Sequence, residues 1–140
     1  MTVTIAPALL CDIEAAAARC DPDEACGLLV GRKQGASHTV TEVHVSRNIA
    51  AEPRHRFEVD PGLRLRLQRQ ARERCERVIG VFHSHPGGEP APSETDRASI
   101  WEPDLIWLIT GVHDGVAGQT KAFMADPAGT GFRPLEMLVV

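Results

Sequence analysis

Residues 78–86 of this 140-residue chain read VIGVFHSHP. The small and apolar residues at the start of this stretch have the length and composition of a buried central strand. His83 and His85 follow two positions apart, and the alternation of a strand places both imidazoles on one face, with Cα atoms roughly 7 Å apart. Pro86 then ends the strand, so both histidines stand where sheet proteins tend to carry function.

The segments on either side of this strand carry helix and strand patterns in an irregular order. A stripe of apolar residues behind Pro7 predicts a helix over 7–20, and further helices are expected over 61–77 and 93–101. The other predicted strands cover 28–30, 39–46, 55–59, 105–112, 119–125 and 132–139. The expected fold class is therefore α/β, a mixed β-sheet flanked by helices, in one domain that covers residues 1–140.

The overall charge and the N-terminus narrow the class of protein. A net charge of −4 and a pI near 5.8 give no electrostatic support for a nucleic-acid partner. The first residues contain no basic region and no apolar run long enough for a signal peptide or a membrane span. The four cysteines include no C-x-x-C pair and are expected to be reduced, mostly buried thiols. We expect a cytoplasmic protein that binds neither nucleic acid nor membrane.

The two histidines become more informative together with the segment that follows them. Ser93 and Asp96 stand three apart at a predicted helix start, on neighbouring positions of one face. Two imidazole nitrogens and one carboxylate make a good catalytic zinc set with a fourth position open for water. Ser93 as helix cap, with Asp96 near the reciprocal capping position, is the alternative interpretation. The two interpretations compete for the same carboxylate.

The string H-S-H-P at 83–86, six intervening residues and S-E-T-D at 93–96 resemble the signature of the JAMM (MPN-plus) metallopeptidases. The segment EACGLLVG, which begins at Glu24, is similar to the glutamate-bearing strand of that family. The resemblance extends from Glu24 to about residue 112 and implies a JAMM/MPN fold of cytidine-deaminase-like architecture. It further implies that His83, His85 and Asp96 ligate one Zn²⁺, that Glu24 hydrogen-bonds the zinc-bound water, and that Ser93 supports the oxyanion at the attacked carbonyl. Without the downstream set, Glu24 would be interpreted as a surface charge.

The resemblance implies a zinc-dependent peptidase or isopeptidase that acts after the C-terminal Gly-Gly of a small ubiquitin-like or sulfur-carrier protein. A role in sulfur-carrier processing, such as freeing cysteine from its carrier, fits the size of the chain. The first alternative is a non-catalytic MPN scaffold that binds partners without zinc. The second is a RadC-like DNA-associated metalloprotein, although that group usually has asparagine between the histidines, where this chain has Ser84. A zinc deaminase is excluded because its H-x-E and P-C-x-x-C segments are missing.

Several other residues that are able to carry chemistry receive structural interpretations. Cys26 is expected to be a buried strand cysteine. The two tryptophans are expected in the core, and the remaining histidines are expected on the surface or in loops. The residues concerned are Trp101, Trp107, His38, His44, His55 and His113. Six arginines between residues 63 and 77 predict a solvated helix face, with a groove for an acidic partner as the alternative.

Overall fold

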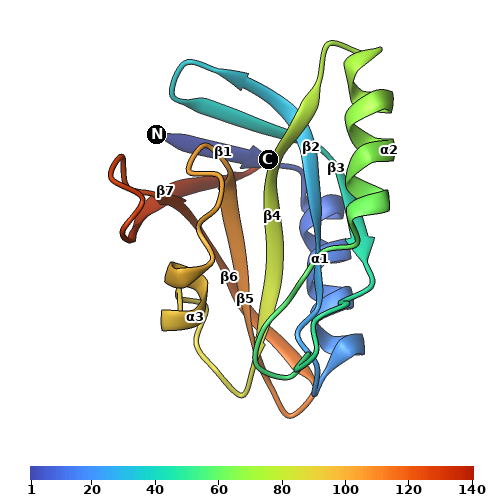
Figure 1. Cartoon of the computed structure of the whole chain (residues 1–140), viewed down its shortest axis with the longest axis vertical. Coiled ribbons are helices and arrows are strands. Elements are labelled where there is room, and N and C mark those ends of the chain that lie inside the picture. The colour runs from blue at the N-terminus through green and yellow to red at the C-terminus, as the bar shows by residue number, and fades with distance from the viewer.

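The computed structural model describes residues 1–140, and its seven strands form one mixed sheet that closes into a barrel (Figure 1). The strand order around the barrel is β1-β3-β2-β4-β5-β6-β7. The strands are β1 (Thr2–Ile5), β2 (Cys26–Gln34), β3 (Ser37–Ser46), β4 (Arg77–Pro86), β5 (Ile106–His113), β6 (Val116–Ala125) and β7 (Phe132–Val139). The helices are α1 (Pro7–Cys20), α2 (Pro61–Arg72) and α3 (Glu94–Ala98). The predicted mixed sheet flanked by helices is confirmed.

The closure of the sheet depends on β1, which the sequence analysis did not predict. This four-residue strand pairs in parallel with β3 on one side and with β7 on the other. Such a short strand leaves almost no periodic pattern in the sequence, because its stability comes from two neighbours that lie far along the chain. Val3 of β1 pairs with His38 of β3, which is 1% exposed, so the predicted place of His38 on the surface or in a loop is wrong. The pairing of β4 with β5 is also parallel, and the remaining neighbours are antiparallel.

The predicted strand over 55–59 is wrong. That segment belongs to an irregular loop whose one ladder contact is a bridge between Asn48 and Val59. The side chain of Asn48 takes the place of a neighbouring strand. Its amide donates to the carbonyls of Pro53 and Arg56, and its oxygen accepts from the backbone N–H of Glu58. Because these backbone groups are already paired, the segment has no need of a sheet neighbour.

Both faces of the sheet are buried, as the continuous apolar runs in the sequence require. One cluster of buried side chains joins α1 to one face, and a second joins α2 to the other. In β2, Leu29 belongs to the first cluster and Leu28 to the second. Gly80 allows β4 and β5 to approach, since a Cβ there would lie 2.4 Å from the carbonyl oxygen of Ile106.

Two elements end earlier than the sequence predicts. Helix α2 stops at Arg72, before Cys75 adopts a positive φ of 57°. Helix α3 stops at Ala98, so that Trp101 lies in an irregular segment and is 84% exposed, which makes its predicted place in the core wrong. Trp107, on β5, is buried as predicted. None of the helices combines the length and apolar composition that crossing a bilayer requires.

Candidate metal centre

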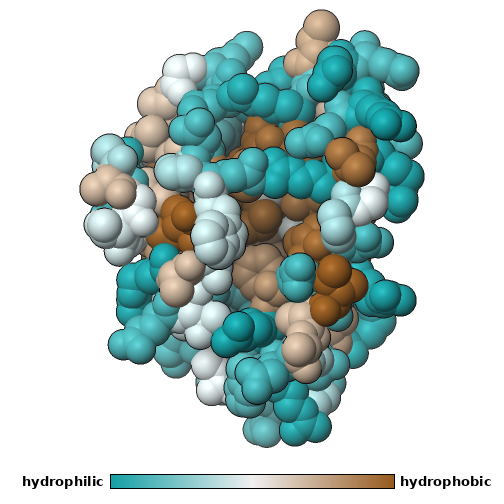
Figure 2. Space-filling model, in the orientation of Figure 1, coloured by the Kyte–Doolittle hydropathy of each residue, from teal (hydrophilic) through white to brown (hydrophobic).

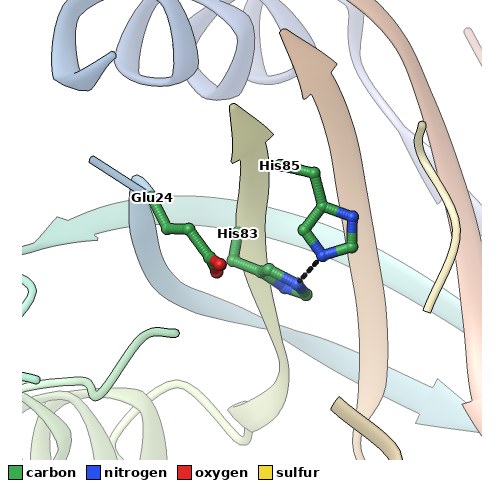
Figure 3. A group of neighbouring side chains, drawn as sticks. All are labelled: Glu24, His83 and His85. Carbon is green, nitrogen blue, oxygen red and sulfur yellow. Dashed lines mark hydrogen bonds between the residues drawn. The ribbon is translucent and has the colours of Figure 1, made fainter. Parts of the chain in front are cut away.

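The two histidines of the central strand converge as alternation predicts. His83 is fully buried, because β4 lies between β2 and β5 and His83 pairs there with Cys26 and Ile109. His85 lies nearer the strand end and is partly exposed. Their Nε2 atoms are 2.9 Å apart, and a dashed line joins the two rings in Figure 3. The two rings therefore present nitrogen atoms to a common point.

Asp96 joins this pair from α3. Its Oδ2 atom lies 3.2 Å from His83 Nε2 and 3.1 Å from His85 Nε2. The same oxygen accepts a hydrogen bond from the Ser93 N–H at 2.9 Å, while the Asp96 N–H donates to Ser93 Oγ at 3.0 Å. This reciprocal pair is the capping box that the sequence analysis set against the metal interpretation. The structure shows that one carboxylate serves the cap and faces both histidines.

Glu24 lies two residues before the start of β2 and is buried. Its side chain points toward the two histidines (Figure 3). Its ligand oxygen and the ligand nitrogens of His83 and His85 all lie within 4.8 Å of one another (Figure 3). Its Oε1 atom has no hydrogen-bond partner. The interpretation of Glu24 as an ordinary surface charge, which its acidic surroundings in the sequence favour, does not hold in the fold.

Two side chains to which the sequence assigns no such role fix the backbone around Glu24. The Asn48 amide donates to the Glu24 carbonyl at 3.0 Å. Ser84 lies between the two histidines, and its Oγ accepts the Ala25 N–H at 2.7 Å. Local sequence gives neither side chain this role, because each acts on a segment that is distant in sequence. They hold the start of β2 beside the histidines of β4.

The two carboxylates of the cluster differ in protonation. Burial raises the pKa of Glu24 to about 8, with the His85 charge opposing the rise and the Asp96 charge adding to it. Burial also acts to raise the pKa of Asp96, but the hydrogen bonds with His83 and His85 outweigh it and hold that pKa well below its ordinary value. Carboxylates whose environments push their pKa values apart are suited to separate tasks. Here Asp96 is the permanent anion and Glu24 the group that can carry a proton.

The two imidazoles differ as well. Burial lowers the pKa of His83 and keeps the ring neutral, although contact with Asp96 opposes the shift. Burial opposes protonation of His85 too, but there the hydrogen bond and the charge of Asp96 outweigh it and raise the pKa. His85 Nδ1 lies 2.9 Å from the carbonyl oxygen of Glu89. Because a carbonyl only accepts, Nδ1 carries the hydrogen of the neutral ring and the lone pair of Nε2 points to the cluster.

The loop that supplies the Glu89 carbonyl is held against β5. The Gly87 N–H donates to the Val112 carbonyl at 2.6 Å, and the Gly88 N–H donates to the His85 carbonyl at 3.1 Å. Gly111 on β5 permits this contact, since a Cβ there would lie 2.8 Å from the Gly88 carbonyl oxygen. The orientation of His85 thus depends on a glycine in the neighbouring strand.

The donor atoms fit a tetrahedral metal ion. His83 Nε2, His85 Nε2 and Asp96 Oδ2 are separated by 2.9, 3.2 and 3.1 Å. Ligand atoms of a zinc site with bonds of 2.0–2.1 Å are about 3.3 Å apart, and two imidazoles with one carboxylate leave a fourth position open. A carboxylate oxygen of Glu24 lies within 4.8 Å of the ligand nitrogens of both histidines, and Oε1 of this carboxylate has no hydrogen-bond partner. The residues therefore suit an ion that binds and activates a water molecule.

An apolar cavity of about 620 Å³ adjoins the cluster. Phe57 and Trp107 line it and also contact His83, with ring centroids at 4.4 Å in a stacked arrangement and at 5.5 Å edge-on. The hydrophobic floor of this hollow is visible in Figure 2, where a hydrophilic band crosses it. An ion pair of Arg64 with Glu102 joins α2 to the segment after α3 at this cavity.

The family described as prokaryotic homologs of the JAB domain matches residues 7–125. The chain belongs to this family. Among curated relatives of this prokaryotic JAB domain, the desampylase of Haloferax volcanii is 38% identical over 88 residues, which are 63% of this chain and 62% of the relative. The CysO-cysteine peptidase of Mycobacterium tuberculosis is 32% identical over 98 residues, 70% of this chain and 65% of the relative. The matched part thus spans a little under two thirds of these relatives.

Solved structures agree with this assignment. A protein from Desulfitobacterium hafniense superimposes on this chain with a TM-score of 0.85 and 28% sequence identity. The match covers 99% of this chain and 92% of that protein. A JAB1/MPN domain protein from Archaeoglobus fulgidus has a TM-score of 0.58 at 21% identity, over 97% of this chain and 96% of that one, which shows the fold alone. The family resemblance seen in the sequence is confirmed.

Proposed function

We propose that this chain is a zinc-dependent peptidase or isopeptidase that hydrolyses the amide bond after the C-terminal Gly-Gly of a small ubiquitin-like or sulfur-carrier protein. The observation that carries the proposal is the buried, unpartnered carboxylate of Glu24 beside two histidines and Asp96. A purely structural site made of His83, His85 and Asp96 would have no use for a second, protonatable carboxylate beside it. The names of the relatives, desampylase and CysO-cysteine peptidase, support the substrate class.

His83, His85 and Asp96 are the proposed ligands of one zinc ion, with water as the fourth. When bound, the ion would act as a Lewis acid and lower the pKa of its water to about 7. The chain's own contribution is to fix the donors before binding. Asp96 is held by its capping box and His85 by the Glu89 carbonyl, so little ordering remains to be done.

Glu24 is the proposed general base and acid. It takes a proton from the attacking water and passes that proton to the amine that leaves. Ser93 is the proposed oxyanion donor. Its Oγ already accepts the Asp96 N–H, so its own hydroxyl hydrogen remains free for the carbonyl oxygen of the substrate. The loss of one such donor typically costs about 10²–10³ in rate.

The Gly-Gly requirement fits the shape of the site. His83 is fully buried, and a peptide backbone reaches its neighbourhood most easily where the peptide lacks side chains. The apolar cavity beside Phe57 and Trp107 is then available to a larger side chain that precedes the two glycines. A carrier protein with an extended C-terminal tail meets both conditions.

A cytoplasmic setting is part of the proposal. All four cysteines are free, as in compartments that keep thiols reduced. Cys26 is buried as predicted, but Cys11 and Cys75 are exposed, so the expectation of mostly buried thiols is wrong. Two exposed thiols stay unpaired more readily in a reducing environment.

The decisive experiment is Glu24→Gln, assayed with a carrier protein fused through Gly-Gly to a reporter. We expect the variant to bind one equivalent of zinc and to lose about 10²–10⁴-fold in hydrolysis, the usual contribution of a general base. Glu136→Gln, an exposed acid on β7, serves as the matched control and should cleave normally. Normal cleavage by Glu24→Gln would remove the general-base assignment. A wild-type protein that takes up no zinc would instead indicate a scaffold.

A further inference from the structure

Hydrogen bonds hold Glu24 in place only through its backbone. Its Oε1 atom has no hydrogen-bond partner, and the bonds that the residue makes involve its N–H and its carbonyl group. A displacement of about 1 Å in a group that takes part in a reaction can cost about 100-fold in rate. The groups that fix the peptide units of Glu24 therefore bear directly on the use of its carboxylate.

Three hydrogen bonds fix these peptide units. The Glu24 N–H donates to the Pro53 carbonyl at 2.7 Å, and the Glu24 carbonyl accepts from Asn48 Nδ2 at 3.0 Å. The next N–H, that of Ala25, donates to Ser84 Oγ at 2.7 Å. The peptide unit between Glu24 and Ala25 is thus held at both of its polar groups by side chains from two distant segments.

Asn48 contributes to two of these three bonds. Its Nδ2 atom also lies 3.4 Å from the carbonyl oxygen of Pro53, the oxygen that accepts the Glu24 N–H. Its Oδ1 atom accepts the N–H groups of Ala50 and Glu58, both at 3.1 Å. Because carbonyl groups only accept and backbone N–H groups only donate, these partners fix the orientation of the amide. One side chain therefore anchors Glu24 and the loop beside it.

The same amide reaches the metal centre through that loop. It donates to the Arg56 carbonyl at 3.0 Å and accepts from the Glu58 N–H, the peptide groups on either side of Phe57. The Phe57 ring stacks on His83 with a centroid distance of 4.4 Å and an interplanar angle of 20°. Asn48 thus connects the backbone of Glu24 with the aromatic ring that covers a proposed metal ligand.

We propose that Asn48 is a positioning residue, which keeps the Glu24 carboxylate beside the two histidines for its exchange of protons with the water. The proposal rests on the proposed function of Glu24 as general base. The bonds of Asn48 all go to backbone groups outside the three proposed metal ligands. Its loss should therefore reduce the rate of the reaction and leave the binding of zinc largely intact.

The test is Asn48→Asp in the full, zinc-loaded chain, with a carrier protein fused through Gly-Gly as substrate. This substitution keeps the shape and the Oδ1 acceptor but removes the donor to the Glu24 carbonyl. We expect kcat to fall at least about tenfold, with KM and zinc affinity changed less than about threefold. In a Glu24→Gln background the same substitution should cause no further loss, because no base is left to position.

Thr41→Val is the matched control. It removes a hydrogen bond from a side chain to the Val30 carbonyl, further along β2, and should lower the melting temperature while kcat stays normal. Asn48→Ser, which introduces no charge, replaces Asn48→Asp if the latter does not fold, with the same results expected.

Amide hydrogen exchange in the zinc-free chain gives a measurement that needs no peptidase activity. We expect the Glu24 N–H to exchange at least about tenfold faster in Asn48→Asp than in the wild type, and at the wild-type rate in Thr41→Val. Unchanged exchange in Asn48→Asp would show that this side chain does not anchor Glu24.

The kinetic results can overturn the proposal in three further ways. A folded Asn48→Asp protein with normal kcat would remove the positioning role. Equal losses of kcat with and without Glu24 would show that Asn48 acts on another group. A parallel loss of zinc would make it a support of the metal ligands instead. Normal cleavage by Glu24→Gln alone would refute the proposed function, and the exchange measurement would still decide whether Asn48 anchors Glu24.

Discussion

His83 and His38 are both almost completely buried, and burial lowers the pKa of each ring. Each also has an unpartnered ring nitrogen. Their neighbours differ in sign, because His83 faces Asp96 whereas His38 faces Lys33 and Arg77. Equal burial therefore does not give equal chemistry. The sign of the surrounding charge decides whether the neighbours of a buried imidazole oppose or reinforce the fall in its pKa.

Asp96→Ala should have the largest effect on this comparison, because it removes the negative charge that faces His83. We expect zinc affinity to fall at least about 100-fold. Loss of the helix cap adds about 1 kcal/mol of destabilisation. Competition with a zinc chelator measures the first effect and thermal unfolding the second. Glu94→Ala is the matched control, because it removes an exposed acid of the same helix turn. An Asp96→Ala protein with normal zinc affinity would reduce Asp96 to a cap.

Gly111→Ala should lower the zinc affinity although it replaces none of the proposed ligands. The new Cβ would lie 2.8 Å from the Gly88 carbonyl oxygen and displace the loop whose Glu89 carbonyl orients His85. We expect a loss of about 10–100-fold in zinc affinity, as is usual for the partner of a ligating histidine. Gly118→Ala is the control, since its Cβ would meet its nearest atom at 3.5 Å. Equal zinc affinity in both variants would show that this loop does not position His85.

His38→Leu tests the other half of the comparison through pH, with a smaller effect. The folded pKa of His38 is lowered, so the unfolded chain binds the extra proton first as pH falls below about 6.5. Wild-type stability should therefore drop by up to about 1 kcal/mol between pH 7.5 and 5.5 relative to His38→Leu. Urea unfolding at both values measures it, with His113→Gln as an exposed control. Parallel losses in wild type and His38→Leu would mean that the buried ring titrates normally.

The part of the metal centre that the sequence predicts rests on local geometry. A strand brings His83 and His85 to one face, and a helix start brings Ser93 and Asp96 together, whatever the rest of the chain does. Glu24 is different, because only the pairing of β2 with β4 brings it to the histidines. Residue spacing cannot reveal such a pairing, so the assignment of Glu24 depended on the family resemblance.

The same reasoning explains what the sequence concealed elsewhere. His38 stands at the start of β3, where its burial depends on β1, a strand too short to be recognised. Phe57 was assigned to a strand, although the bonds of Asn48 shape its loop and turn its ring onto His83. In each case a long-range partner determines the environment, and local periodicity carries no record of that partner.

The shared use of the Asp96 carboxylate has a consequence for the lifetime of the protein. Helix α3 has five residues, far fewer than a helix needs to persist unaided, and Asp96 ties its first turn to the histidines of β4. The segment from Gly87 to Asp104 is thus attached to the barrel in part through the proposed metal ligands. Loss of the proposed ion would weaken this attachment and expose the segment to cellular proteases. Metal supply would then govern how much of the protein survives as well as how fast it works.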